Sequence, residues 1–439
     1  MSTAPTKAAT DRPVPVDVAS MPGTTPRLVH TDRHVEDLAD YRLGGGYAPL
    51  ETPDRLLREV DDSGLRGRGG AGFPLGIKLR SVAAHGVRAD GAIVVANGEE
   101  GEPASVKDRW LMRHRPHLVL DGLRLAAAAV GARRGHVYVS DAESASAIET
   151  AVSDAAEILG NLELSVLVVG AGYVSGEETA AIRAINGGPA KPSDKPPRPF
   201  EQGVAGMPTL VSNVETLAHI PYIARHGAGA FRSRGTTLSP GTFLATVTGA
   251  GKPPVLYEIP HGLPLTDLLA LHGVSPEDVR GILMGGYFGG LLGRDVLTGT
   301  LDHESIRSLG GGLGCGAISL ITDECPVAVG ASVMSYFDRE NAGQCGSCFN
   351  GTAAMAAVLN GLRDGIADAD DLARLERWSV VLRGRGACAT LDAATNVAAT
   401  VLSGFQDAVA DHRSGRCTTC AEAPYRTLRP FAVEIGAPL

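Results

Sequence analysis

Three cysteines in the last third of the chain have the spacing of an iron–sulfur or metal site. Cys345 and Cys348 form a C-x-x-C pair inside "ENAGQCGSCFNGT", and Cys388 follows in "GACATLD". A cluster normally takes four thiolates. The position three before Cys345, where a further thiolate would complete the run, is Ala342. These residues predict a redox centre whose usual ligand set is one thiolate short.

A glycine-rich loop, "GLRGRGGAGFPLGIK" (64–78), contains a G-x-G-x-x-G pattern that begins at Gly67. That pattern marks a dinucleotide site only between a strand and a helix, and here a helix precedes it, so a standard Rossmann turn is not expected. Consecutive glycines let backbone N–H groups approach an anion, and Arg66, Arg68 and Lys78 add positive charge. Phosphate binding is therefore favoured over the alternative of a flexible surface loop.

Two acidic stretches follow predicted strands. "NGEEGEPASVKDR" (97–109) carries three glutamates directly after a strand, and "SVLVVGAGYVSGEETAAIRAI" (165–185) has a strand, a glycine turn and a helix that starts at Glu177–Glu178. Ligands of open α/β sheets collect at the carboxyl ends of strands. Carboxylates there would repel a pyrophosphate but could bond ribose hydroxyls or a nicotinamide amide. The structural alternatives are a solvated acidic loop and a pair that suits a helix dipole.

The elements that must position these residues alternate between strand and helix. Strands are expected at 91–97, 135–140 and 164–169, and helices at 52–65 and 115–131, which predicts a parallel sheet covered on both faces. Short strands and turns follow, and then helical periods. We expect these units in order: a loose N-terminal arm (1–40), an α/β domain (41–240), a small mixed domain (241–325), a helical domain (326–412) and a tail with Cys417 and Cys420 (413–439).

Composition excludes several classes of protein. Formal net charge is −9, aromatic residues make up 5%, and no dense basic run occurs, which argues against nucleic acid as a partner. The longest apolar runs fall short of the ~20 residues of a membrane span, so no direct membrane insertion is expected. No signal peptide is visible, and five of the seven cysteines follow residue 340. We therefore expect a cytoplasmic protein whose cysteines serve metal or redox chemistry.

Five stretches together closely resemble one family: "GLRGRGGAGFPLGIK", "NGEEGEPASVKDRWLM", "YVSGEETA", "VSNVETLAHIP" and "GQCGSC". In this order they resemble the NADH-binding flavoprotein subunit of respiratory complex I, a module that also occurs in NAD-linked hydrogenases and formate dehydrogenases. The likeness covers roughly residues 40–412. It implies a Rossmann-like FMN- and NAD(H)-binding domain at 41–240, a β-grasp (SLBB-like) domain at 241–325, and a helical bundle with one iron–sulfur cluster at 326–412.

The resemblance also assigns site residues. It implies that FMN is surrounded by Gly67, Arg68, Gly69, Gly70, Lys78, Asn97, Glu99, Tyr173, Gly176, Asn213 and Thr216. It implies that Phe73 lies near the dinucleotide and that the nicotinamide pocket is lined by Glu177, Glu178 and two catalytic carboxylates, Glu100 and Glu102. The implied cluster ligands are Cys345, Cys348 and Cys388.

Two departures from the family touch the nucleotide. The family's "KPPFP" is "KPPRP" here, with Arg198 in place of an aromatic, and its "KWSF" is "KLRS", which leaves Arg80 and Ser81. Each lost aromatic stack should weaken adenine binding by up to roughly 1–3 kcal/mol, by analogy with nucleic-acid sites. Arginine can stack or pair with a 2′-phosphate. We expect NADH to remain the donor because Glu178 is retained, with NADPH less firmly excluded.

The third departure is the cluster loop, which reads "SCGQCTPC" in the family and "NAGQCGSC" here. A [4Fe–4S] cluster could take a substitute ligand from Asn341, solvent, or Cys417 or Cys420. A [3Fe–4S] cluster would need only the three cysteines, and a chain without a cluster is the third outcome. A cluster of either type held by three cysteines is favoured over one with a thiolate from the tail. Cys417 and Cys420 are otherwise a free pair or a small metal site shared with a partner. Cys315 and Cys325 are expected to be buried packing residues.

The expected activity is that of an NAD(P)H-oxidising flavoprotein. FMN would link a two-electron nicotinamide to a one-electron cluster, and a ferredoxin or a subunit with a two-iron cluster would accept the electrons within a hetero-oligomer. One alternative is a standard NADH-dehydrogenase subunit of complex I, a hydrogenase or a formate dehydrogenase. The other is a catalytically silent scaffold that binds FMN.

Overall fold

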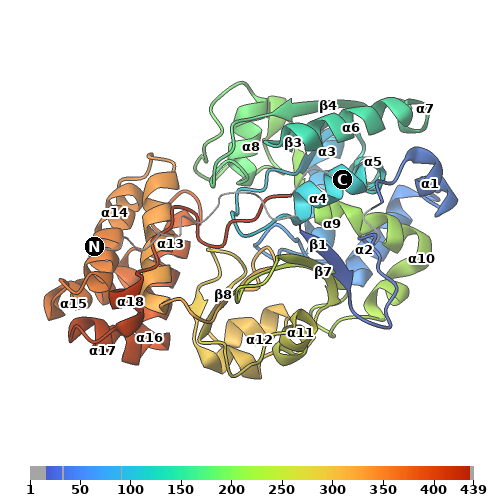
Figure 1. The fold of residues 1–439 in the computed structure, drawn as a ribbon. Coiled ribbons are helices and arrows are strands. Elements are labelled where there is room, and N and C mark those ends of the chain that lie inside the picture. The colour runs from blue at the N-terminus through green and yellow to red at the C-terminus, as the bar shows by residue number, and fades with distance from the viewer. Residues whose placement is uncertain (1–15, 32–33, 90, 436–439) are drawn as a thin grey trace, which may run out of the picture.

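The computed structural model describes residues 16–31, 34–89 and 91–435. Figure 1 shows three units: a sheet wrapped by helices, a second sheet beside it, and a bundle of helices formed by the last part of the chain. A separate hydrophobic cluster fills each of the three. Among the described residues, no helix is both long and apolar enough to cross a membrane.

The first sheet is parallel throughout, as the alternating pattern predicted. Its order is β4-β3-β2-β5, and in register Val95 of the central strand faces His136 on one side and Val211 on the other. The strands are β2 (Ala92–Asn97), β3 (Ala132–Val139), β4 (Glu163–Val168) and β5 (Thr209–Asn213). Nearly every residue of β2 is buried, which suits a central parallel strand covered on both faces.

Helices surround this sheet, and their ends follow local rules. Thr52 caps the first long helix by accepting from the N–H of Arg55, Pro53 occupies its first turn, and Gly64 ends it with a φ of 67°. The helices are α1 (Leu38–Leu43), α2 (Pro53–Ser63), α3 (Leu75–Ala89), α4 (Lys107–His114), α5 (Pro116–Val130), α6 (Ala142–Asp154), α7 (Ala156–Leu159), α8 (Glu178–Ile185), α9 (Val214–Ala218) and α10 (Ile220–Arg232), with a 3₁₀ turn at Val204–Gly206.

The second sheet has the order β1-β7-β6-β10-β8-β9. Its strands are β1 (Asp17–Ser20), β6 (Thr242–Gly249), β7 (Val255–Pro260), β8 (Gly281–Met284), β9 (Leu291–Leu292) and β10 (Ala317–Ile321). Helices α11 (Leu265–His272) and α12 (His303–Ser308) and a 3₁₀ turn at Arg294–Thr298 accompany it. The mixture of parallel and antiparallel pairs agrees with the small mixed unit expected from residue 241.

The N-terminal segment differs from the loose arm expected over 1–40. Residues 1–15 lie outside the described residues, but β1 pairs in parallel with β7, as Figure 1 shows. Leu28 and Val29 are buried, and their backbone N–H groups donate to the buried carboxylate of Glu258. Local sequence does not indicate this arrangement, because the backbone hydrogen bonds of the segment are made with residues more than 200 positions away.

The bundle consists of α13 (Pro326–Glu340), α14 (Gly346–Arg363), α15 (Ala369–Val381), α16 (Thr390–Gly404), α17 (Gln406–Arg413) and α18 (Thr418–Glu422). The stretch "NVAATVLSGFQDAVADH" (396–412) has a helical period and predicts one helix, but the structure breaks it at Phe405, whose φ of −136° is not helical. The Phe405 ring is buried against Gly281 of β8, where an added Cβ would lie 2.6 Å from it. This packing against the second sheet accompanies a break of one residue between α16 and α17.

Candidate active site

Most of the sequence-predicted site residues lie at one edge of the parallel sheet. Asn97 ends β2, the glycine turn from Gly170 follows β4, and Asn213 ends β5 and caps α9. Parallel strands all present their carboxyl ends at the same edge. The glycine-rich loop between α2 and α3 lies against that edge, because an added Cβ on Gly69 would come 3.2 Å from the Cβ of Asn213.

The glycine-rich loop is closed on itself by backbone hydrogen bonds. The N–H of Gly67 donates to the carbonyl of Phe73 at 2.9 Å, and the N–H of Leu75 donates to the carbonyl of Leu65. The N–H of Arg68 donates to the hydroxyl of Thr216 at 2.8 Å, which fixes the loop to α9. A helix precedes the loop and a helix follows it, so the prediction that this is not a standard Rossmann turn is confirmed.

The tip of this loop has unused donors. No described residue accepts from the backbone N–H groups of residues 69–72. Gly70 has a φ of +119° and nothing within 4 Å of an added Cβ, so the tip faces open space. Lys78 lies one turn into the next helix. Successive free N–H groups with a nearby ammonium form a nest for an oxygen-rich group, and the loop therefore fits the phosphate or the ring carbonyls of a flavin.

The acidic loop after β2 packs on the glycine turn after β4, backbone against backbone. The Nδ2 of Asn97 donates to the carbonyl of Gly176 at 2.7 Å. Gly176 has no room for a side chain, because an added Cβ would lie 2.9 Å from the carbonyl oxygen of Glu99. Glu99 itself is buried, and its Oε2 has no partner among the described residues. Burial raises the pKa of Glu99 to about 7, so part of its population is protonated at neutral pH.

Glu100 and Glu102, the predicted catalytic carboxylates, lie in different environments. Glu100 is folded back onto its own loop, where it accepts from Ser105 Oγ at 2.5 Å and from Arg109 Nε at 3.2 Å. Glu102 reaches the second sheet and accepts from the N–H of Tyr287 at 2.9 Å. Burial raises the pKa of Glu102 to about 8. One carboxylate thus holds the loop together, while the other carries a proton at neutral pH.

Glu177 and Glu178 are both paired with lysine. Glu177 caps α8 and lies 3.0 Å from Lys195 Nζ. Glu178 lies 3.0 Å from Lys78 Nζ and 2.9 Å from Lys195 Nζ. Burial by itself would raise the pKa of Glu178, but the two ammonium groups lower this pKa to about 2. The carboxylate is therefore always ionised, and its charge is balanced by two cations.

A buried ion network beneath the site was not predicted. Lys107 is 1% exposed, and its Nζ lies 2.7 Å from Asp108 and 3.0 Å from Glu215. Burial by itself would lower the pKa of Lys107, but Asp108 and Glu215 raise this pKa above its usual value. The Nδ2 of Asn213 donates to Asp108 at 2.7 Å. The only signal in the sequence is the run "KDR" at a helix start, and such runs are usually solvated.

Tyr173 and Phe73 occupy contrasting positions. The Tyr173 ring packs edge-on against Tyr336 and Phe337 of α13, with ring centres 5.6 and 5.4 Å apart. This residue thus joins the glycine turn to the helical bundle. The Phe73 side chain is 52% exposed at the rim of the glycine-rich loop, a position from which it could cover a bound nucleotide.

The three predicted cluster cysteines lie near one another. Cys345 directly precedes α14 and accepts from the N–H of Ala387, next to Cys388, at 3.4 Å. Cys348 is buried, and burial, with the neighbouring Cys388 and Cys345 thiols, raises its pKa to about 12. The loop that carries them is fixed to the parallel-sheet unit. Its Gln344 accepts from Arg183 and donates to the carbonyl of Pro192, and Lys191 donates to the carbonyl of Ala342.

The structure narrows the choice of a fourth cluster ligand. Asn341 closes the end of α13: its Nδ2 donates to the carbonyls of Phe337 and Asp338, and its Oδ1 accepts from Gly343. Cys417 and Cys420 lie with Cys325 and His412 instead. Neither of these proposed substitutes is therefore placed to complete the cluster. Cys325 is buried in the core, as expected, but its thiol also lies beside His412 and Cys417. Cys315 is half-buried, with a hydrogen bond to the carbonyl of Gly285.

Comparison with known proteins covers both halves of this arrangement. The family model described as "Nuo51 FMN-binding domain" matches residues 60–222, which hold the glycine-rich loop and the acidic loop. The model described as "NADH-ubiquinone oxidoreductase-F iron-sulfur binding region" matches residues 328–412, which hold Cys345, Cys348 and Cys388.

Individual relatives extend over most of the chain. A subunit of the NADH-quinone oxidoreductase of Rhizobium meliloti (strain 1021) is 34% identical over 382 residues, which is 81% of this chain and 90% of the relative. The NADP-reducing hydrogenase subunit HndC of Solidesulfovibrio fructosivorans is 34% identical, over 80% of this chain and 76% of the relative. The crystal structure of an NAD⁺-reducing [NiFe]-hydrogenase in the air-oxidized state matches with a TM-score of 0.78 and 30% identity, over 87% of this chain and 67% of that one. The chain therefore belongs to the family of FMN-binding, iron–sulfur-binding flavoprotein subunits of NADH:quinone oxidoreductases and related hydrogenases.

Proposed function

We propose that this chain is an NAD(P)H-oxidising flavoprotein that delivers electrons one at a time, through an iron–sulfur cluster, to a protein acceptor. FMN, when bound, accepts hydride as an electron pair and gives up single electrons. The nest at residues 69–72 and the buried contacts of Arg68 and Asn213 would hold it at the carboxyl edge of the parallel sheet.

The observation that carries this proposal is the contact between the two halves of the site. The glycine turn at the sheet edge touches α13 through Tyr173, and the cluster loop is bonded to residues 183–192 of the parallel-sheet unit. Burial raises the pKa of the Tyr173 phenol, and the nearby Glu102, Cys315, Tyr336 and Cys388 raise it further. A cofactor at the sheet edge and a cluster on Cys345, Cys348 and Cys388 would thus be neighbours.

The carboxylates around the edge would orient the nicotinamide. Glu102 holds a proton at neutral pH and could donate it as a hydrogen bond to the carboxamide, while Glu100 keeps the loop closed through Arg109. Glu178 could bond ribose hydroxyls from the start of α8. These roles, like those of Gly67, Gly69, Gly70 and Thr216 at the flavin, remain proposals.

We propose NADH as the main donor, with NADPH less firmly excluded. A carboxylate normally rejects a 2′-phosphate by repulsion, but here Lys78 and Lys195 neutralise Glu178. Arg80 is engaged with Asp61, whereas the Arg198 guanidinium has no partner among the described residues. The relative HndC is named as NADP-reducing, which agrees with a pocket of this kind.

The acceptor that fits best is a small iron–sulfur protein, such as a ferredoxin or a subunit with a two-iron cluster. The chain would then work in a hetero-oligomer in the cytoplasm, where its seven unpaired cysteines stay reduced. The alternative of a standard complex I subunit would need the usual four-thiolate cluster, which Ala342 does not provide.

The test is anaerobic titration of the chain, purified with flavin and reconstituted with iron and sulfide. NADH should bleach the flavin, and a ferredoxin added next should be reduced in proportion to NADH. Bleaching without onward reduction, when iron is present, would favour the silent scaffold. Failure of both nucleotides to bleach bound flavin would overturn the proposal.

A further inference from the structure

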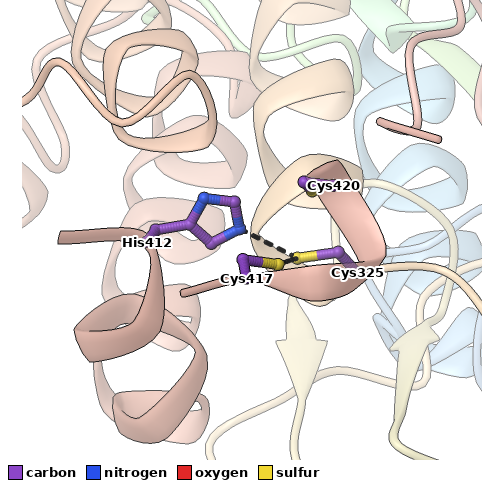
Figure 2. Close-up of side chains that lie close together, drawn as sticks. All are labelled: Cys325, His412, Cys417 and Cys420. Atoms are coloured by element: carbon purple, nitrogen blue, oxygen red, sulfur yellow. Dashed lines mark hydrogen bonds between the residues drawn. The ribbon is translucent and has the colours of Figure 1, made fainter. Parts of the chain in front are cut away.

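A second group of metal-binding side chains lies away from the cluster cysteines. Cys325 precedes α13, His412 lies near the end of α17, and Cys417 and Cys420 flank the start of α18 (Figure 2). The four donor atoms all lie within 4.8 Å of one another. Three helices that are separate in sequence thus bring three thiols and one imidazole to one point.

The distances suit a single tetrahedral ion. With Zn–S of about 2.3 Å and Zn–N of about 2.0–2.1 Å, tetrahedral geometry places two sulfurs about 3.8 Å apart and a sulfur and a nitrogen about 3.6 Å apart. The Sγ atoms of Cys325 and Cys417 are 3.9 Å apart, and the Cys325 Sγ lies 3.1 Å from His412 Nε2. A disulfide would need sulfurs about 2.05 Å apart, and all of these cysteines are free.

Other features also point to an ion. Cys417 and Cys420 have the C-x-x-C spacing of zinc sites, which folds both thiols toward one centre. Cys325 and His412 are each 3% exposed, so the group is closed toward solvent on that side. The His412 ring lies close to the backbone of Leu362 and Arg363 at the end of α14.

The group would anchor the start of the segment that follows the bundle. Helix α18 has five residues, none of them buried. After it the chain runs back to the first unit, because Tyr287 donates to the carbonyl of Pro430 and the N–H of Val433 donates to the carbonyl of Pro103. We call residues 414–435 the C-terminal strap. It ends beside the acidic loop, where Arg109 donates to the carbonyl of Val433.

We propose that Cys325, His412, Cys417 and Cys420 bind one structural Zn²⁺ ion that fixes the C-terminal strap to the helical bundle. Four protein ligands leave no open position, which is the arrangement of structural rather than catalytic zinc. The ion would supply the binding energy that a short exposed helix lacks. The site is independent of the proposed oxidoreductase activity and contains none of the three cluster cysteines.

The first experiment is metal analysis of the full-length protein, purified without chelators after growth with both iron and zinc. We expect about one zinc per chain in addition to cluster iron. The variants Cys420→Ser and His412→Ala should each lose most of the zinc and keep FMN and iron. The matched control, Cys345→Ser, should lose cluster iron and keep zinc. Retention of zinc in both strap variants, or iron bound at these four ligands, would overturn the assignment.

A second measurement covers the case in which a variant does not fold. Wild-type protein loaded with Co²⁺ in place of zinc should show the absorption of a tetrahedral cobalt–thiolate centre, at wavelengths longer than the flavin bands. Chelation of wild-type zinc should speed protease cleavage within residues 414–435, and Zn²⁺, but not Mg²⁺, should reverse this. No zinc in folded wild-type protein, or a cleavage rate that does not respond to zinc, would contradict the proposal whether or not the protein oxidises NADH.

Discussion

At the scale of single residues, the carboxylates at the sheet edge have opposite protonation states because their surroundings differ. Two lysines lower the pKa of Glu178 to about 2, whereas burial without a cation in contact raises that of Glu102 to about 8. One group is fixed as an anion and the other holds a proton at neutral pH. Neighbouring groups with pKa values driven apart are typical of sites that bind and orient a reactive ligand.

The pairing of Glu178 leads to a prediction about coenzyme choice. Glu178→Gln removes a carboxylate that contacts both Lys78 and Lys195, so Lys78 becomes available to a 2′-phosphate while Lys195 keeps its pair with Glu177. The ratio of kcat/KM for NADH to that for NADPH should fall by about tenfold, equivalent to about 1.4 kcal/mol. Steady-state kinetics with both coenzymes measures this. Glu149→Gln, the same change at an exposed position of α6, should leave the ratio unchanged, and an equal ratio in both variants would contradict the prediction.

The pKa of Glu102 predicts a pH dependence of stability. Its folded-state pKa of about 8 lies above the ordinary value of 4.5, so the folded protein holds a proton that the unfolded chain releases. The stability from this group is complete below pH 4.5 and is lost as the pH rises through 8. Glu102→Gln, which has no such proton to lose, should lose less stability between pH 5 and pH 9, by on the order of 1–2 kcal/mol. Parallel slopes for wild type and variant in denaturant unfolding across this range would refute the argument.

At the scale of elements, the site depends on loops whose backbones touch. The glycine turn after β4 meets the acidic loop after β2 at Gly176, where an added Cβ would lie 2.9 Å from a carbonyl oxygen. Gly170, in the same turn, has open space around it. Gly176→Ala should force the two loops apart and weaken FMN binding at least about tenfold, whereas Gly170→Ala should bind FMN as the wild type does. Flavin fluorescence titration of the apoprotein compares them, and similar affinities in both variants would count against this geometry.

The loop between α13 and α14 gives a prediction about the cluster. Ala342→Cys restores the C-x-x-C-x-x-C run, and the iron content after reconstitution should rise to about four per chain, with the EPR signal of a reduced [4Fe–4S] cluster. The control is Ser347→Cys, which adds a thiol outside that register. If both variants keep the wild-type iron content, Ala342 is not the position that limits the cluster.

Local sequence patterns were sufficient for the elements with long, periodic or well-capped sequences. The strands β2, β3 and β4 and the helices α2 and α5 lie within a few residues of their predicted positions. Strands β5 and β1, of five and four residues, were missed, because so short a run has no clear period and forms only by pairing with distant strands. The break at Phe405 was also missed, since it depends on packing against β8.

The binding sites, like the secondary structure, could be predicted only where local sequence determines them. Glycine-rich and acidic motifs could be brought together from sequence because parallel strands end at a common edge. The group at Cys325 and His412 could not, because its members are 87 residues apart and meet only through the packing of α13 against α17. Lys107 was missed for a related reason: burial of a lysine depends on Asp108 and Glu215, and nothing local indicates it.

At the scale of the whole molecule, the C-terminal strap links units that are far apart in the sequence. It leaves the bundle at α18, where Arg426 pairs with Asp364, and reaches the core of the first unit at Val433. The guanidinium of Arg109 connects the end of the strap to Glu100 in the acidic loop. The distance between the flavin side and the cluster side is therefore held by the chain's own end as well as by Tyr173.

Val433 provides the test of this link. Its side chain is 5% exposed, whereas that of Leu428 in the same strap is 71% exposed. Val433→Asp should release the end of the strap and lower the free energy of unfolding by about 2–3 kcal/mol, since it removes a buried valine and places a charge in an apolar site. Leu428→Asp should change it by less than about 0.5 kcal/mol. Hydrogen exchange should show the release directly, as faster exchange at residues 430–435 and in the acidic loop of the valine variant alone. Unchanged protection of the acidic loop in Val433→Asp would mean that the loop holds its position without the strap.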